Sequence, residues 1–163
     1  MTRDDRTDGG FQPPRYHRIL VALDDSPAAA SAFHHAVALA REQQARLTLV
    51  TVVPSPSTLV AAAGIAPHAL QAEMQAEAAA HLRVLASSVP EEISLTTVVR
   101  DGDPAEELLA ILNEEPFDLL CMGARGRGWL ATTLLGSVSA AVLHRSPTAV
   151  MVLHPAPSMD LSA

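Results

Sequence analysis

The stretch ILVALDDSP, residues 19–27, joins an apolar run to the start of a helix. Five consecutive apolar residues are typical of a strand that is buried on both faces of a sheet. Ser26 is a favourable N-cap, and Pro27 suits the first helical position because its ring fixes φ and no N–H is needed there. Phe33 and Val37 follow at helical spacing. The stretch therefore predicts a strand over 19–23 followed by an amphipathic helix.

The same alternation of strand and helix continues along the chain. Further strands are expected at 47–53, 93–99, 118–122 and 148–153. Helices are expected around 70–85, from Asp103 onward, and around 137–144, and the helix at Asp103 begins with a capping box that Glu106 completes. Because strands alternate with helices, the connections should be right-handed crossovers, which give a mainly parallel sheet covered on both faces. The sequence thus predicts an α/β fold.

The length of 163 residues allows one compact domain and is too short for two ordinary ones. Residues 1–16 contain Gly9-Gly10 and Pro13-Pro14 and few apolar side chains, so they are expected to form a flexible leader. Residues 156–163 are expected to form a flexible tail. The domain itself is predicted to span residues 17–155.

Composition excludes several classes of partner. The formal net charge of −7 argues against a nucleic-acid or anionic-membrane surface, because such surfaces need a basic face. A membrane-spanning helix needs ~20 mostly apolar residues, and no run of that kind is present. The leader also lacks the apolar segment of a secretory signal. We therefore expect a cytoplasmic protein without a nucleic-acid or membrane partner.

The basic residues restrict the possible chemistry further. All 11 are arginine, and the absence of lysine excludes a Schiff-base lysine, a kinase-type lysine and a Walker loop. The single cysteine, Cys121, excludes an internal disulfide, and the seven histidines show no metal-ligand spacing. A bound phosphate would have to be held by backbone N–H groups, hydroxyls or arginine. No catalytic residue and no metal site are predicted.

Two places stand directly after predicted strands, where parallel sheets bind ligands at the point of strand-order reversal. Asp24-Asp25 follows the first strand, and the glycine-bearing stretch 123–128 follows the fourth. Glycines let backbone amides approach an anion, and the helix start at Gly136-Ser137 adds unpaired N–H groups and a favourable dipole. The plainer interpretation is that these glycines only turn the chain. Asp24-Asp25 could also act as a carboxylate pair, although a ligand-facing Asp beside a helix-dipole partner is more common.

The glycines Gly123, Gly126 and Gly136 with Ser137 form the pattern G-x2-G-x9-G-S, which resembles the ATP-binding branch of the universal stress protein family. The resemblance extends over residues 18–154 and includes the Gly102-Asp103-Pro104 turn. It implies a single-domain, five-stranded parallel sheet of order 3-2-1-4-5 with helices on both faces. This is a Rossmann-like fold of the adenine nucleotide α-hydrolase type. In that order the ends of strands one and four lie side by side, so the two candidate places become one cleft.

The resemblance also implies which residues would form an ATP site. Base and ribose would be flanked by Ala22, Leu23 and Asp24, and adenine by Val52 and Met122. Ribose and phosphates would be enclosed by Gly123, Gly126, Gly136, Ser137 and Val138, with Ser139 as a further hydroxyl. Arg125 and Arg127 would lie in an exposed loop, either at the phosphates or solvated. A Mg²⁺ ion would be carried by the phosphates.

The expected function is a nucleotide-responsive stress-response module that hydrolyses ATP slowly or not at all. No residue is an obvious base for activating water, and no lysine can neutralise charge on the γ-phosphate. The resemblance implies a homodimer through residues 148–153, and an exposed apolar edge strand favours such pairing. Two alternatives remain open: a dimeric stress protein without ATP, and a nucleotidyl-transfer enzyme of the same superfamily. The sequence also leaves open whether the loop 54–67 covers the site.

Overall fold

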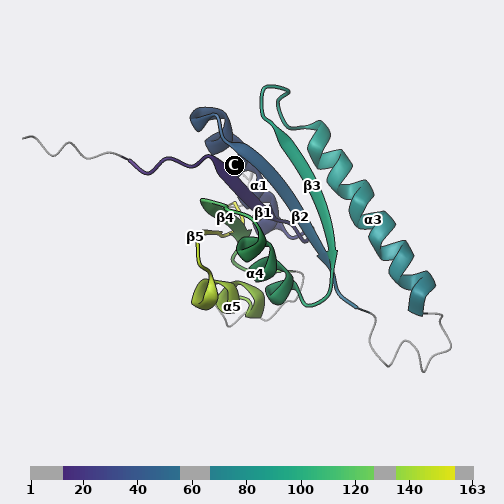
Figure 1. Ribbon diagram of the computed structural model, residues 1–163. Coiled ribbons are helices and arrows are strands. Elements are labelled where there is room, and N and C mark those ends of the chain that lie inside the picture. Colours follow the sequence, from purple (N-terminus) through teal and green to yellow (C-terminus); the bar gives the residue numbers. More distant parts are fainter. Residues whose placement is uncertain (1–12, 56–66, 127–134, 157–163) are drawn as a thin grey trace, which may run out of the picture.

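The computed structural model describes residues 13–55, 67–126 and 135–156, in which strands and helices alternate (Figure 1). The expected leader and tail therefore lie mostly outside the described residues. In chain order the elements are β1 (Arg18–Ala22), α1 (Pro27–Gln43), β2 (Arg46–Val53), α3 (Pro67–Ser87), β3 (Leu95–Asp101), α4 (Pro104–Glu114), β4 (Leu119–Gly123), α5 (Ser137–Arg145) and β5 (Ala149–Leu153).

The five strands form one parallel sheet in the order β3-β2-β1-β4-β5, which confirms the predicted fold. Strand β1 occupies the centre, where Ile19 lies opposite Leu47 of β2 and Leu119 of β4. Helices α1 and α3 cover one face, and α4 and α5 cover the other (Figure 1). The strand order reverses between β1 and β4, so the carboxyl ends of these strands are neighbours.

The core consists of two aliphatic layers, one on each face of the sheet. Ile19 and Val21 of β1 pack with α1 and α3, whereas Leu20 packs with α4 and α5, and all three side chains are 0% exposed. Phe33 and Phe117 are buried in opposite layers. The continuous apolar run over 19–23 is explained by this central position, since a strand covered on both faces has no polar side.

The helix starts follow the predicted capping residues. Ser26 caps α1 by accepting a hydrogen bond from the N–H of Ala29 at 3.1 Å. Asp103 caps α4 by accepting from the N–H groups of Ala105 and Glu106 at 3.0 and 3.1 Å. The predicted capping box is wrong in one respect, because the Glu106 carboxylate binds the Arg145 guanidinium of α5, with Arg145 Nη2 3.0 Å from Glu106 Oε2. The hydrogen bond from Arg145 lowers the pKa of Glu106.

The third strand differs from its expected range. It spans Leu95–Asp101, so it begins and ends two residues later than 93–99. Ile93 is buried, but its N–H donates to the carbonyl of Pro90 in a turn before the strand begins. Ile93 is therefore buried without belonging to the strand, and only the backbone hydrogen bonds show where the strand begins.

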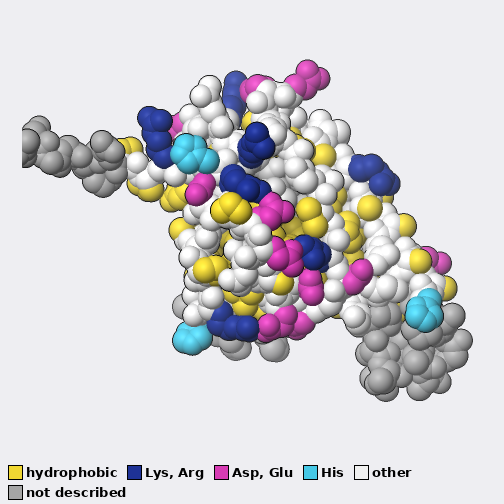
Figure 2. Space-filling view, viewed as in Figure 1, with side chains coloured by type: hydrophobic (Ala, Val, Ile, Leu, Met, Phe, Trp, Pro, Cys, Tyr) yellow, Lys and Arg dark blue, Asp and Glu magenta, His cyan; other side chains and the backbone are white. Residues whose placement is uncertain are grey.

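The charged surface over α4 is a mixture of both signs (Figure 2). Arg18 pairs with Glu115, and Arg100 pairs with Glu114, so opposite charges lie next to each other on this face.

Within the described ranges, no helix has the length and apolarity needed to cross a membrane. At the ends of the described chain, the N–H of Tyr16 donates to Gln43 Oε1 at 2.7 Å, and the N–H of Ala156 donates to Ser31 Oγ at 3.0 Å.

The thiol of Cys121 is expected to be unreactive in the folded protein. It is 0% exposed in β4, and burial raises its pKa to about 12. Because the thiolate is the nucleophile, alkylation by iodoacetamide at about pH 8 should be at least about a hundredfold slower than in the unfolded chain. Mass spectrometry of timed samples, with a parallel series in concentrated guanidinium, measures the ratio. Full labelling of the folded protein at the unfolded rate would contradict this prediction.

Candidate functional site

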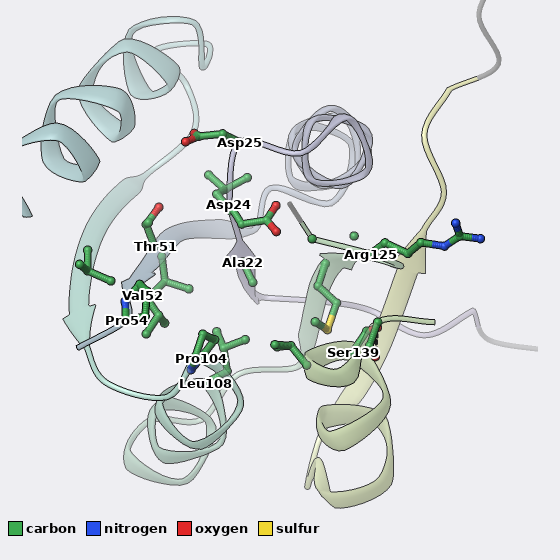
Figure 3. Close-up of a pocket in the computed structure, with 18 of the residues that line it drawn as sticks. Ala22, Asp24, Asp25, Thr51, Val52, Pro54, Pro104, Leu108, Arg125 and Ser139 are labelled. Carbon is green, nitrogen blue, oxygen red and sulfur yellow. Dashed lines mark hydrogen bonds between the residues drawn. The ribbon is translucent and has the colours of Figure 1, made fainter. Parts of the chain in front are cut away.

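A cleft of about 890 Å³ lies at the carboxyl ends of the strands, where β1 and β4 are neighbours (Figure 3). This volume is near the upper end of the range of about 300–1,000 Å³ found for small-molecule sites. The ends of β1, β2 and β4 form its floor, the first turns of α4 and α5 form one side, and α3 forms the other. The position agrees with the general rule that open parallel sheets bind ligands at the point of strand-order reversal.

Asp24 and Gly126 come together at the centre of this cleft. Asp24 Oδ1 accepts a hydrogen bond from the N–H of Ser26 at 3.2 Å, which orients the carboxyl group. A Cβ atom placed on Gly126 would lie 2.4 Å from Asp24 Oδ2, well inside contact distance. With a larger residue at this position, the Asp24 carboxylate would have to turn away, so glycine permits the close approach seen here.

The segment after β4 is held in place by backbone hydrogen bonds around Ala124. The N–H of Ala124 donates to the carbonyl of Leu153, and the carbonyl of Ala124 accepts from the N–H of Gly136, both at 2.7 Å. The buried hydroxyl of Ser139 also lies 2.8 Å from the Ala124 carbonyl. Ser139 thus lines the cleft, while its hydroxyl donates to the backbone carbonyl of Ala124 in the same segment.

The N-terminus of α5 faces the cleft. Gly136 is its N-cap, and with no side chain it leaves the first-turn N–H groups without a side-chain cap. Ser137 and Val138 of this first turn line the cleft. Unpaired N–H groups and the positive end of a helix dipole favour an anion, so this side of the cleft can hold a phosphate group.

An apolar slot lies between the sheet and α4. Val52 of β2 and Met122 of β4 line it from the sheet, and Pro104 and Leu108 line it from α4 (Figure 3). Ala22 at the end of β1 lies between the two strands. Apolar walls of this kind suit a flat aromatic ring, whose faces need no hydrogen-bond partners.

Carboxylates are prominent among the described side chains of the cleft. Asp24, Asp25 and Glu77 all line it. The only histidine among the described lining residues, His81, places its Nε2 atom 3.0 Å from Asp25 Oδ1. The guanidinium of Arg125 points away from the cavity (Figure 3). A phosphate group bound among the described residues would therefore depend on N–H groups and hydroxyls more than on cationic side chains.

The structure brings together almost all of the predicted site residues. Twelve of the thirteen line the cleft, and Arg127 lies outside the described residues; the twelve are Ala22, Leu23, Asp24, Val52, Met122, Gly123, Arg125, Gly126, Gly136, Ser137, Val138 and Ser139. Pro54 at the start of the predicted loop 54–67 lines the cleft, and residues 56–66 lie outside the described residues.

Sequence reasoning did not identify the wall that α3 contributes. Met74, Glu77, Ala78 and His81 line the cleft from this helix, and Thr51 lines it from β2. Met74, Ala78 and His81 do recur at helical spacing, so the sequence indicated that they share one side of a helix. It contained no signal of what that side faces, because this depends on how α3 crosses the end of β2.

Comparisons with known proteins agree over most of the chain. A model described as the Universal stress protein family matches residues 15–154. The universal stress protein YxiE of Bacillus subtilis is 31% identical over 146 residues, which cover 85% of this chain and 99% of that protein. The solved structure of the universal stress protein UspA from Lactobacillus plantarum has a TM-score of 0.73 and 29% identity, and covers 86% of this chain and 99% of that one. A universal stress protein solved in complex with cAMP has a TM-score of 0.61 and 25% identity, and the match covers 88% of this chain and 100% of that one.

Proposed function

This chain belongs to the universal stress protein family, and we propose that it binds an adenine nucleotide, ATP in particular, in the cleft at the ends of β1 and β4. The observation that carries the proposal is the close approach of Gly126 to Asp24 in the cleft that the N-terminus of α5 also lines. This arrangement places a carboxylate for hydroxyl groups beside a set of N–H donors for an anion. A nucleotide has both groups, a ribose and a phosphate, next to each other.

We assign each part of the nucleotide to one part of the cleft. The adenine ring would lie in the apolar slot between Val52 and Met122, with the backbone of Ala22 and Leu23 at its edge. The Asp24 carboxylate would accept hydrogen bonds from the ribose hydroxyls, which are donors of the right kind for it. This assignment is supported by the relative solved with cAMP, a ligand that also combines adenine, ribose and phosphate.

The phosphates would be held by N–H groups and a hydroxyl. The segment Gly123–Gly126 and the first turn of α5, with Ser137 and Val138, supply these donors. A Cβ atom at Gly126 would collide with Asp24 Oδ2, so the absence of a side chain here lets the Asp24 carboxylate lie beside this segment. Mg²⁺ carried by the phosphates would supply positive charge next to the carboxylates of the cleft.

We propose a cytoplasmic regulatory module that responds to nucleotide and turns it over slowly or not at all. The sequence contains no lysine, and the described Arg125 side chain points away from the cleft (Figure 3). Little positive charge is therefore available from the described side chains of the cleft to stabilise a γ-phosphate as it leaves. A homodimer through β5 fits the same proposal, because β5 is an edge strand of the sheet and no described strand pairs with its outer side.

Isothermal titration calorimetry tests the proposal directly. ATP should bind with a dissociation constant in about the micromolar range, with one site per chain, and Mg²⁺ should tighten the binding of ATP more than that of cAMP. GTP is the matched control, because it offers the same ribose and phosphates with a different base. Absence of heat with ATP, ADP, AMP and cAMP would contradict the proposal and favour the alternative of a stress protein that acts only through protein contacts. Transfer of AMP from ATP to an acceptor would instead support the nucleotidyl-transfer alternative.

A further inference from the structure

The first half of α3 is not anchored in the apolar core. From His68 to Glu77 every side chain is exposed or half-buried; Ala78 is the first buried residue of the helix, and Leu82, which is 1% exposed, belongs to the apolar core. This half nevertheless supplies Met74 and Glu77 to the cleft. Segments with few buried apolar contacts open at low free-energy cost, so their position depends on polar contacts.

Asp101 provides such a polar contact at the end of β3. Its Oδ1 atom accepts a hydrogen bond from Gln71 Nε2 at 2.6 Å, and its Oδ2 atom accepts one from Gln75 Nε2 at 2.5 Å. The two glutamines lie one turn apart on α3, so one carboxylate spans both. Hydrogen bonds to a charged acceptor are stronger than those between neutral groups.

The Asp101 contact connects α3 to the floor of the cleft. Asp101 lies opposite Val53 in the register of β3 and β2, and Val53 lines the cleft. On α3, Met74 lies between Gln71 and Gln75 in sequence and also lines the cleft. The carboxylate therefore joins the helix that carries the far wall to β3, and β3 is paired with β2, a strand of the floor.

The Gln71 side chain depends on its hydrogen bond to Asp101. Gln71 Oε1 is buried and accepts no hydrogen bond from the described residues. An unpaired buried acceptor is unfavourable, so the Gln71 side chain is retained there by its bond to Asp101 and not by complete pairing of its own groups. Further along α3, the contact of His81 with Asp25 at 3.0 Å is the next polar connection to the cleft.

We propose that Asp101 is a positioning residue for the nucleotide, and this inference rests on the proposed function. Through Gln71 and Gln75, Asp101 holds the first half of α3 against the ends of β2 and β3 and so keeps the far wall of the cleft in place. Asp101 itself is not among the residues that line the cleft. It acts through the helix and does not contact the ligand.

The expected effect follows from the fraction of molecules in which the first half of α3 is held in place as the far wall of the cleft. When the binding-competent arrangement is only partly populated, the apparent affinity falls by that fraction. If removal of the carboxylate leaves the wall in place for about one fifth of the time, ATP binds about fivefold more weakly. The global stability should change little, because the contact is exposed and lies outside the two apolar layers.

The test compares Asp101→Ala, the double variant Gln71→Ala with Gln75→Ala, and all three changes together. The control is Arg100→Gln. This change is on the same strand as Asp101, but it removes the ion pair of Arg100 with Glu114 of α4 and leaves the two glutamines of α3 unchanged. Calorimetry with ATP and hydrogen exchange of residues 68–77 without ligand are the two readouts. We expect about fivefold weaker binding and faster exchange in all three variants, no further loss in the combined one, and wild-type values in the control. Asp101→Glu, which keeps the carboxylate, should recover part of the affinity.

The outcomes separate this inference from the function on which it rests. Wild-type affinity in Asp101→Ala, or weaker binding with unchanged exchange of residues 68–77, overturns the positioning role and leaves nucleotide binding in place. An equal loss in Arg100→Gln also overturns it, because the effect would then belong to the surface of β3 in general. Absence of ATP binding in the wild type overturns the proposed function, and the positioning role with it.

Discussion

Replacing Gly126 with alanine is expected to weaken ATP binding at least about tenfold. The new Cβ would lie 2.4 Å from Asp24 Oδ2, so the carboxylate has to turn away from its position. Asp24 would then lose its hydrogen bonds to the ribose, and a hydrogen bond to a charged group contributes about 1.5–3 kcal/mol. Since 1.4 kcal/mol corresponds to a factor of about ten, calorimetry with ATP should resolve the change easily.

A double-variant cycle shows whether this loss acts through Asp24. If alanine at Gly126 displaces the carboxylate, the variant that also carries Asp24→Ala should bind no more weakly than Asp24→Ala alone. The melting temperature should remain close to that of the wild type, because the atom that has to move is the end of a side chain. Unchanged affinity in Gly126→Ala would contradict the assignment of this glycine to the nucleotide site.

Replacing Gly123 with alanine is expected to destabilise the fold itself. Its Cβ would lie 2.9 Å from both the Ala28 Cβ and the backbone N of Ala29, in the first turn of α1. This turn is fixed by the Ser26 cap, whose Oγ accepts from the Ala29 N–H at 3.1 Å, so the backbone cannot move aside without losing that bond. Overpacking of this kind costs about 1–3 kcal/mol. Urea unfolding should show the loss as a lower midpoint with an unchanged slope.

Gly136→Ala is the matched control for this prediction. Its φ of −73° is accessible to alanine, and the nearest described atoms to its Cβ would be Ala124 O and Arg125 Cα, both at 3.5 Å. Since alanine is a poorer N-cap than glycine, the stability of this variant should fall by about 0.5–1 kcal/mol, without the additional cost of overpacking. Equal destabilisation by alanine at Gly123 and at Gly136 would show that the close contact with α1 is not the cause.

The architecture was accessible from local sequence because local and tertiary preferences agree in this chain. The apolar run over 19–23 is typical of a central strand, and β1 is indeed buried on both faces. Ser26 and Asp103 are favoured N-caps, and both accept the hydrogen bonds expected of them. The order of the strands came from the resemblance to a family, since nothing in the alternation of strands and helices specifies which strands are neighbours.

The candidate site was predictable as a set of residues but not as an arrangement. The spaced glycines and Asp24 could be selected because they follow strands, and parallel strands bring their carboxyl ends to one edge. The direction of the Arg125 side chain and the backbone hydrogen bond of the Ser139 hydroxyl were not predictable. Both depend on the course of the chain around Ala124, which contacts Leu153 and Gly136 at distant sequence positions.

The sequence by itself determined the alternation of elements, the aliphatic core, the absence of lysine chemistry and the glycines at which a backbone can approach an anion. These properties depend on residue type and on spacing within a few turns. Only the tertiary structure decided that α3 forms a wall of the cleft, that Asp101 binds two of its glutamines, and that Glu106 pairs with Arg145. Such contacts join segments whose relative placement is set by the packing of whole layers, and hydrophobic burial is non-directional, so no local pattern encodes which polar side chains meet.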